Sequence, residues 1–329
     1  MRARLEHYLT GLWFSQRRPP LWLRALVPFY RTAAGRRARV TKERPPSPVI
    51  VVGNITVGGS GKTPVVAALA KMLQHAGHAL AVISRGYGGQ GSEAPRAVTP
   101  SSDPESVGDE PVLLARRAGC AVWVCRDRRA ALSAAIGGGA DVVLSDDGLQ
   151  HSRLPRSYEI CVIDGLRGLG NGYLLPAGPL RQPVERLSSI DQVLVKEAGR
   201  EHGDLEAFGT PFAVAPGRPY RLSAPEDEAA MPPREPFDAV CAIGNPDSFF
   251  VLLEALGYRF RPRPFPDHHA FTAAELSRFP GPLIVTEKDA VKLEHLDELP
   301  ETWVLPIEAT LPASVREAVL AHVREFQSS

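Results

Sequence analysis

A glycine-rich stretch between a short apolar run and a predicted helix carries the residues best suited to chemistry. The apolar run over residues 49–52 ends at Gly53, the loop follows, and Lys62 and Thr63 stand where the helix begins. Glycines let backbone N–H groups converge on phosphate oxygens, and a helix N-terminus adds partial positive charge. A lysine at this place reaches the β- and γ-phosphates, and a threonine hydroxyl binds Mg²⁺. The stretch therefore predicts a nucleoside triphosphate site.

The loop departs from the usual phosphate-loop spacing at one position. A glycine normally lies five residues before Gly61, and Thr56 occupies that position. The local order resembles variant loops of chaperone-like and partitioning ATPases, in which a lysine often stands where this chain has Val57. The loop alone therefore leaves open a P-loop ATPase of the partner-binding or metallochaperone type. We expect the triphosphate to be bound by Val57, Gly58, Gly59, Ser60, Gly61, Lys62, Thr63 and Pro64.

Two adjacent carboxylates follow another apolar run. Residues 142–144 predict a buried strand, and Asp146 and Asp147 come directly after it. A strand that ends in aspartate is where such proteins hold the Mg²⁺ that accompanies the triphosphate. Asp-Gly is also a common turn pair, so a simple turn is the alternative. Gln150 and His151 follow, and we expect them to line the same site.

Two arginines are candidates to hold phosphate oxygens. Arg85 follows the strand predicted over residues 79–83, and Arg181 closes the proline-rich segment 175–181. Guanidinium groups bind phosphate oxygens through paired hydrogen bonds. A structural ion pair is the alternative for each of them.

A histidine in the last third of the chain is a candidate general base. His268 lies in an Asp-His-His run that follows three closely spaced prolines. A histidine in such a position can assist removal of a proton from a hydroxyl group, and a plain loop is the alternative. Residues 286–289 (Thr-Glu-Lys-Asp) follow a predicted strand, so they also lie at a ligand-facing edge unless they form a solvated helix start.

Composition and charge bound the class of protein. The chain has 329 residues, of which 44% are hydrophobic and 23% charged, so a folded protein with two domains is expected. The net charge is +1, but residues 1–44 carry +9 and the remainder −8, which predicts an anionic partner for the basic end alone. We expect no nucleic-acid partner, and a monomer. The four cysteines show no metal-binding spacing, which predicts buried thiols in a reducing compartment.

The basic N-terminal end is also rich in aromatic residues. Apolar residues recur at helical spacing over residues 5–13, Pro19 and Pro20 break this helix, and residues 21–30 can form a second one. Large apolar groups flanked by arginines are typical of an interfacial helix on an anionic membrane. A helix packed on the body of the protein is the alternative. Residues 36–44 predict an extended lead into the first strand, and no apolar run is long enough to span a bilayer.

Predicted strands and helices alternate along the rest of the chain. The helices are expected over residues 64–76, 109–118, 128–136, 248–256 and 313–326, and residues 90–108 are expected to form a long loop. The strands are expected over 49–52, 79–83, 121–124, 142–144, 160–163, 192–195, 212–214, 239–243, 283–285 and 303–307. Such alternation predicts a parallel sheet with both faces covered and ligands at the strand carboxyl ends.

The predicted fold class is therefore α/β, with a three-layer core like that of P-loop NTPases. The expected organisation is a membrane-contacting amphipathic segment over residues 1–44, the P-loop core over 45–222, and a smaller α/β domain over 223–329. Residues 223–238 are rich in proline and acidic residues, and they predict a linker or a surface excursion.

Seven short motifs occur in a characteristic order along the chain. They cover residues 53–54 with 57–63, 84–88, 108–111, 146–151, 175–181, 265–269 and 286–289. As a set they resemble the tetraacyldisaccharide 4'-kinase family of lipid A biosynthesis in Gram-negative bacteria. The resemblance implies transfer of the ATP γ-phosphate, with Mg²⁺, to the 4'-hydroxyl of a tetraacylated glucosamine disaccharide 1-phosphate. It also implies a cleft between two domains and a peripheral location on the cytoplasmic face of the inner membrane.

The resemblance also implies roles for individual residues. The implied catalytic set is Asp109, His268, Lys62, Asp147 and Arg181, in which Asp109 and His268 act together on the sugar hydroxyl. The implied metal ligands are Thr63, Asp146 and Asp147. The expected substrate-binding residues are Asn54, Arg85, Tyr87, Gln150 and His151. One departure is Gln182, where many family members have an acidic residue after the arginine.

Overall fold

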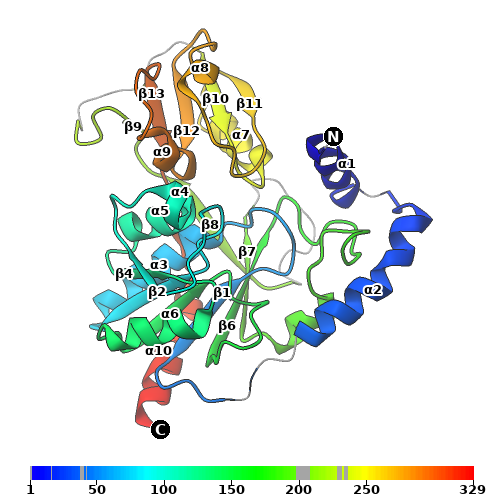
Figure 1. The fold of residues 1–329 in the computed structure, drawn as a ribbon, viewed down its shortest axis with the longest axis vertical. Coiled ribbons are helices and arrows are strands. Elements are labelled where there is room, and N and C mark those ends of the chain that lie inside the picture. Colours follow the sequence, from blue (N-terminus) through cyan, green and yellow to red (C-terminus); the bar gives the residue numbers. More distant parts are fainter. Residues whose placement is uncertain are drawn as a thin grey trace.

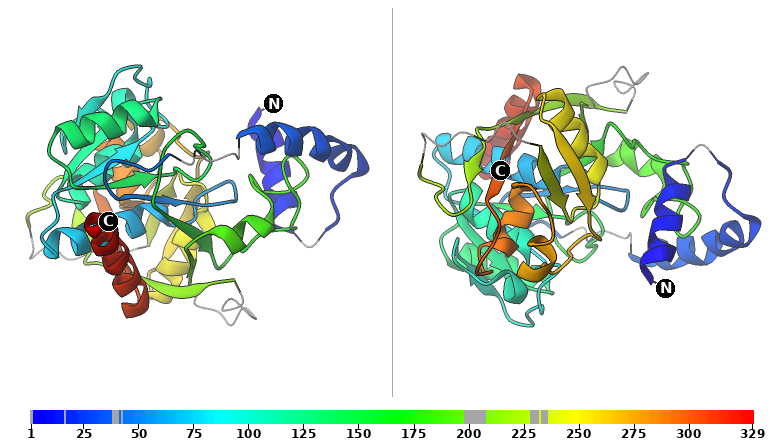
Figure 2. Two further views of the ribbon diagram at one scale, coloured as in Figure 1. Left: turned by 90° about the horizontal axis from the view of Figure 1, so that it is seen from below. Right: turned by 90° about the horizontal axis from the view of Figure 1, so that it is seen from above.

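The computed structural model describes residues 2–15, 17–37, 41, 43–197, 208–227, 232 and 236–329. Figure 1 shows a large α/β unit, a smaller unit at one end of it, and two N-terminal helices that project to one side. Figure 2 shows the same projection from two further directions. The polypeptide thus forms three recognisable parts, and the first two enclose the candidate site.

A nine-stranded sheet forms the centre of the large unit. Its strand order is β14-β8-β7-β6-β1-β5-β2-β4-β3. All neighbouring pairs are parallel except the two edge pairs, β3 with β4 and β14 with β8. The strands are β1 (Val49–Gly53), β2 (Leu80–Ser84), β3 (Arg96–Val98), β4 (Ala121–Val124), β5 (Val142–Asp146), β6 (Tyr158–Asp164), β7 (Gln192–Lys196), β8 (Thr210–Pro216) and β14 (Ile307–Thr310).

Two apolar cores cover the two faces of this sheet. Because side chains alternate along a strand, Ile50 and Val52 enter one core, and Val49 and Val51 enter the other. Helices α3 (Lys62–His75), α5 (Asp109–Arg117) and α10 (Ala313–Ser328) pack on the first core, and α6 (Arg128–Gly137) packs on the second. A sheet buried on both faces explains the continuous apolar runs in its strands. The three-layer α/β prediction is confirmed.

A five-stranded sheet forms the smaller unit. The order is β11-β10-β12-β13-β9, and only the β9 pair is antiparallel. The strands are β9 (Tyr220–Arg221), β10 (Phe237–Cys241), β11 (Phe260–Pro264), β12 (Leu283–Thr286) and β13 (Thr302–Leu305), with helices α7 (Pro246–Ala255), α8 (Ala273–Leu276) and α9 (Glu287–Leu293). Strand β11 was not predicted, because its two prolines are unusual in a strand. It lies at the sheet edge, where a missing N–H is tolerated.

The end of the chain returns to the large unit. The single strand predicted over residues 303–307 is instead β13 followed, after Pro306, by β14, and the two belong to different sheets. Helix α10 then contacts α3. The expected assignment of all residues 223–329 to the smaller domain is therefore wrong for β14 and α10, and β9 belongs to the smaller sheet rather than to 45–222. A strand's own sequence does not specify which of two sheets it joins.

The N-terminal part consists of helices α1 (Arg2–Trp13) and α2 (Leu21–Arg37). Because α2 runs to Arg37, the extended lead predicted from residue 36 is wrong at its start, and residues 38–40 and 42 lie outside the described part. None of the helices in the described part of the chain combines the length and apolar character that a membrane crossing needs.

The structure also tests three smaller predictions. The predicted loop 90–108 contains the short elements β3 and α4 (Pro104–Val107). The linker predicted over 223–238 ends earlier, because β10 begins at Phe237, and its residues 228–231 and 233–235 lie outside the described part. All four cysteines are free thiols, three of them buried.

Candidate functional site

A cavity of about 1210 Å³ is lined by both units. The whole predicted phosphate loop, residues 57–64, lies on its wall. The other predicted site residues on the wall are Arg85, Tyr87, Asp146, Asp147, Gln150, His151, Arg181 and His268. Two predicted residues, Asn54 and Asp109, are buried behind this wall.

The loop after β1 has a backbone that favours glycine. Gly58 and Gly61 have φ angles of 93° and 83°, and Gly61 is the N-cap of α3 without a side-chain hydrogen bond. The first amides of α3 are therefore free to bind phosphate oxygens. Asn54 was expected to bind substrate, but its buried Nδ2 donates to the Gly58 carbonyl at 3.3 Å. Its contact in the structure therefore supports the loop from behind.

Lys62 and Arg181 meet on the carboxylate of Asp147. The Lys62 Nζ lies 3.5 Å from Asp147 Oδ1, and Arg181 Nη2 lies 3.1 Å from the same oxygen. Burial raises the pKa of Asp147, but the two cations outweigh it and hold that pKa well below its usual range. Arg181 does form an ion pair, but this pair lies inside the cleft, so its role in holding phosphate oxygens stays a prediction. These residues place two positive charges beside the glycine loop.

Asp146 is a buried carboxylate without a hydrogen-bond donor in the described part of the protein. It is 1% exposed, and neither of its side-chain oxygens has a partner there. Burial and the nearby Glu110 raise its pKa to about 7. Its backbone carbonyl accepts a 2.7 Å hydrogen bond from Arg128, a fully buried arginine that the sequence did not single out. An unpaired carboxylate at a strand end is a suitable ligand for a divalent cation.

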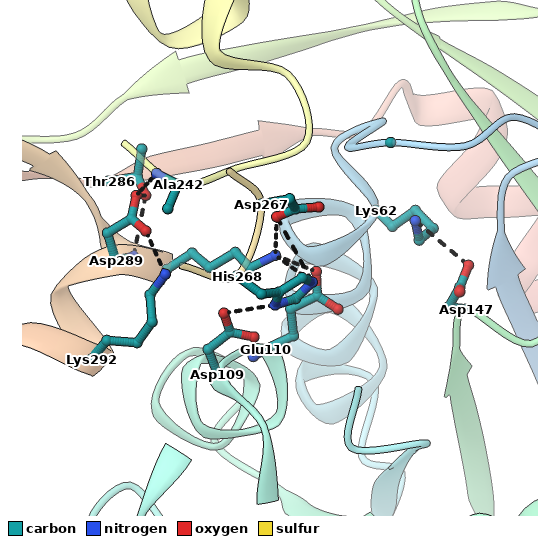
Figure 3. Close-up of polar contacts among 12 residues, drawn as sticks. Lys62, Asp109, Glu110, Asp147, Ala242, Asp267, His268, Thr286, Asp289 and Lys292 are labelled. Carbon is teal, nitrogen blue, oxygen red and sulfur yellow. Dashed lines mark hydrogen bonds and ion pairs between the residues drawn. The ribbon is translucent and has the colours of Figure 1, made fainter. Parts of the chain in front are cut away.

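Asp109 and His268 come from the two different units and meet at the cleft. Asp109 begins α5, and its Oδ2 lies 3.1 Å from His268 Nδ1 (Figure 3). Burial raises the pKa of Asp109, but the hydrogen bond with His268 and the charges of Lys288 and His268 together outweigh burial, so this pKa is lowered. Burial lowers the pKa of His268, but the hydrogen bond and charge of Asp109, with the charge of Asp267, together raise it above its usual value. The pair has the charge arrangement of a carboxylate that orients a basic imidazole.

The smaller unit also touches the phosphate loop directly. A Cβ on Gly244 would lie only 2.4 Å from the Gly59 nitrogen, so a side chain does not fit there. Arg167 Nη1 donates to the Gly244 carbonyl at 2.6 Å, and Asn245 Nδ2 donates to Asp164 at 3.2 Å. These contacts place the small unit against the loop, and therefore place His268 opposite Lys62 across the cleft.

The motif over residues 286–289 starts a helix and also faces the cleft. Thr286 is the N-cap of α9, but this helix start is not the solvated one given as the alternative, because Asp289 is fully buried. Asp289 is fully buried and accepts hydrogen bonds from Thr286 Oγ1 at 2.8 Å and from the Ala242 N–H at 3.1 Å (Figure 3). Thr286, Glu287 and Lys288 all line the cleft, as the prediction of a ligand-facing edge requires.

The remaining predicted polar residues surround the glycine loop. Gln150 donates from Nε2 to the Asn54 carbonyl at 2.7 Å and to Gln182 Oε1 at 3.3 Å. Burial and the nearby Arg128 lower the pKa of His151 to about 4, so its imidazole is neutral at pH 7. Gln182, which stands where many family members have an acidic residue, accepts the hydrogen bond from Gln150 through Oε1, a contact that a carboxylate could also make.

The parallel sheet with a glycine loop between β1 and α3 defines a P-loop α/β protein. A family model described as tetraacyldisaccharide-1-P 4'-kinase (LpxK) matches residues 18–324. The chain belongs to this kinase family.

Curated relatives and a solved structure agree with this assignment. The chain is 47% identical to the tetraacyldisaccharide 4'-kinase of Alkalilimnicola ehrlichii, over 97% of this chain and 98% of the relative. It is 46% identical to that of Alcanivorax borkumensis, over 95% and 94%. A crystal structure of Aquifex aeolicus LpxK, described as a complex with ATP, has a TM-score of 0.69 at 24% identity and covers 98% of this chain and 99% of its own. That similarity shows the shared fold.

Proposed function

We propose that this protein transfers the γ-phosphoryl group of ATP to the 4'-hydroxyl of a tetraacylated glucosamine disaccharide 1-phosphate. The observation that carries the proposal is that a phosphate-binding half and a proton-accepting half face one cleft. Lys62 and the glycine loop form the first half, and His268 with Asp109 behind it forms the second (Figure 3). Family membership supplies the acceptor class.

The residues of the cleft then have separate tasks. The loop amides and Lys62 bind the triphosphate and spread the negative charge that develops on the transferred group. Arg181 adds a second cation on the same side. The Asp109–His268 pair takes the proton of the acceptor hydroxyl as the oxygen attacks phosphorus. Holding the donor and acceptor in one enclosed site supplies the orientation that transfer requires.

Mg²⁺ fits the acidic groups of this site. Asp146 has no hydrogen-bond donor among the described residues, and Asp147 and Thr63 lie on the same wall of the cleft. The described residues contain no cluster of three or more His, Cys, Asp or Glu that could hold a metal, which suits Mg²⁺ because it is usually bound by one or two carboxylates with phosphates and water. Bound there by Asp146, Asp147 and Thr63, the ion would neutralise phosphate charge.

Replacing Asp146 with asparagine should separate its effect on the stability of the protein from its proposed role in binding Mg²⁺. In EDTA we expect Asp146→Asn to raise the melting temperature by about 2–4 °C, because a buried carboxylate without a hydrogen-bond donor is removed. Mg-ATP should raise the melting temperature of the wild type by more than that of the variant. The control is Asp141→Asn, an exposed carboxylate before β5. Equal stabilisation of all three proteins by Mg-ATP would show that Asp146 binds no metal.

One assay tests the proposed reaction. Purified protein with Mg-ATP and the disaccharide 1-phosphate should produce the bisphosphate. If ATP is hydrolysed at the same rate with and without the disaccharide and no bisphosphate forms, the partner-binding ATPase alternative is favoured and the kinase proposal is wrong for this acceptor.

We further propose that α1 and α2 contact an anionic membrane on the cytoplasmic face of the inner membrane. One side of this helix pair is docked on the protein, because Trp13 Nε1 donates to the Pro176 carbonyl at 2.9 Å and Tyr30 OH donates to the Arg181 carbonyl at 3.2 Å. The other side exposes large apolar side chains, with Trp22 at 58% and Phe29 at 75%. Exposed aromatic groups beside arginines favour an interfacial role over simple packing.

Two substitutions on α2 test this surface. Replacing Trp22 and Phe29 together with serine should weaken binding to vesicles containing anionic lipid by about tenfold or more, because two large side chains no longer enter the interface. Co-sedimentation with the vesicles measures this. Leu256→Ser, an exposed apolar residue after α7, is the control and should bind as the wild type does. Unchanged binding of the double variant would favour helices that serve only packing.

A further inference from the structure

Lys288 is a buried cation that the proposed reaction does not yet use. It lies in α9 and lines the cleft, and 14% of its side chain is exposed. Its Nζ lies 3.1 Å from Glu110 Oε1, 3.4 Å from Asp267 Oδ1 and 3.4 Å from His268 Nε2. The lysine therefore contacts the proposed base on the ring nitrogen that Asp109 does not touch.

The two neighbours of His268 restrict where its proton can lie. An ionised Asp109 only accepts hydrogen bonds, so His268 Nδ1 must carry a hydrogen at their 3.1 Å contact. The Asp109 Oδ1 already accepts the Glu110 N–H at 2.8 Å, which fixes the orientation of the carboxylate. An ammonium group only donates, so Lys288 can bond His268 Nε2 only through the lone pair of that nitrogen. Both contacts are satisfied together in one state, the neutral Nδ1–H tautomer.

We infer that Lys288 is a positioning residue that opposes protonation of His268 at Nε2 and so holds the proton of the neutral ring on Nδ1, with the lone pair of Nε2 available in the cleft. The consequence for phosphoryl transfer depends on the function proposed above, whereas the tautomer does not. A histidine held in this state is ready to accept a hydroxyl proton at Nε2. A protonated imidazole would instead place an N–H against the ammonium.

The charged groups that face His268 in the described part of the chain come from three elements. Asp109 and Glu110 come from α5, Asp267 from the segment after β11, and Lys288 from α9. The ring of Tyr87, with its centroid 5.0 Å away, packs from the segment after β2. Burial and Lys288 lower the pKa of His268, but Asp109 and Asp267 raise it by more, so the pKa lies above its usual value and Lys288 limits the rise. Asp267 Oδ1 lies 3.8 Å from Nε2 and favours protonation, so Lys288 is the neighbour that opposes it.

A role for Lys288 in binding a substrate phosphate fits the contacts less well. Two carboxylates, Glu110 and Asp267, already neutralise its ammonium group. Burial lowers the pKa of Lys288, but Glu110 and Asp109 raise it well above its usual range, so the group remains cationic. The local charge around Lys288 is therefore acidic, and an anion would be repelled.

The wild-type protein alone provides the first test. Nitrogen-15 spectra of the histidine side chains, with the His268 signals assigned by their loss in His268→Gln, report which ring nitrogen carries the proton. Above the pKa of His268 we expect the Nδ1–H tautomer to predominate. A predominant Nε2–H tautomer would overturn the inference, and this result needs no Lys288 variant to fold.

The second test compares two lysines of the same helix. Lys288→Met should raise the pKa of His268 by about one unit, because the opposing cation is lost. Lys292→Met removes the cation paired with Asp289 at 2.8 Å, and should move that pKa much less. If the two variants shift the pKa of His268 equally, or Lys288→Met leaves it unchanged, Lys288 has only a structural role.

The pH dependence of kinase activity provides a third test, and its result can be distinguished from the NMR result. The acidic limb of kcat/KM for the disaccharide should move to higher pH by about one unit in Lys288→Met, because His268 must lose its proton before it can act as a base. A profile that does not move while the NMR pKa does would show that the proposed role of His268 as a base is wrong. The NMR result then still decides whether Lys288 positions the imidazole.

Discussion

Replacing Lys62 with alanine is expected to lower kcat for phosphoryl transfer by about 10²–10³-fold. The side chain begins α3 and is 13% exposed, and its ammonium group lies at the glycine loop beside Asp147. A cation at this position interacts most strongly with the charge that develops on the transferred phosphoryl group, so the loss should be larger in kcat than in KM for ATP. Steady-state kinetics with the disaccharide 1-phosphate measure both constants.

The fold should survive this substitution. Asp147 keeps its 3.1 Å ion pair with Arg181, so its carboxylate is not left without a partner. Arg129→Ala is a matched control, since it also removes a cation, but one that pairs with Glu43 at the surface, where ion pairs contribute little. We expect this control to retain wild-type activity. Substantial residual activity in Lys62→Ala would mean that the loop amides alone bind and activate the triphosphate.

The half of the site that binds phosphate could be predicted from the sequence because its signals are local. A β-branched run, a glycine loop and Lys-Thr are contiguous, and Asp146 ends a strand that pairs with β1. Carboxyl ends of parallel strands meet at one edge of a sheet, so the prediction of α/β alternation already brought these groups together. No long-range contact had to be guessed.

Other parts of the site depend on tertiary contacts that leave no local signal. Arg128 begins α6 and looks like a surface charge in the sequence, yet it is 2% exposed and bonds the carbonyl of Asp146. Gly244 follows a predicted strand as many turn glycines do, and only its approach to Gly59 shows why a side chain is excluded. The return of β14 to the large sheet also leaves no local signal, because it depends on the pairing of β14 with β8.

The pairing of Asp109 with His268 could be predicted only through the resemblance to a known family, although His268 alone was a candidate base from the sequence. Asp109 and His268 are 159 residues apart and belong to different units. The local sequence around each residue does not indicate that it contacts the other. The contact between them forms because the small unit packs against the phosphate loop. Lys288 was named only as part of a motif at a strand end, and its place beside His268 emerges from the packing of α9 next to α5.

A double-mutant cycle on Asp109 and His268 should show that the two residues act as a unit. We expect Asp109→Asn and His268→Gln each to lower kcat by about 10²–10³-fold. An asparagine amide can donate to Nδ1, which favours the wrong tautomer, and glutamine is not basic. Because each change disables the same proton transfer, the double variant should lose about as much activity as either single variant. The measurement is the single-turnover rate at saturating ATP for the wild type, the two single variants and the double variant.

A neighbouring histidine provides the control for this cycle. His269 directly follows His268, but its Nε2 pairs with Glu275 at 3.3 Å and it does not line the cleft. His269→Gln should therefore retain activity close to that of the wild type. If the losses in Asp109→Asn and His268→Gln instead multiply in the double variant, the residues contribute independently, and Asp109 does more than orient the imidazole. Its buried carboxylate would then interact with the acceptor hydroxyl directly, which requires the acceptor to reach past His268 to the N-terminus of α5.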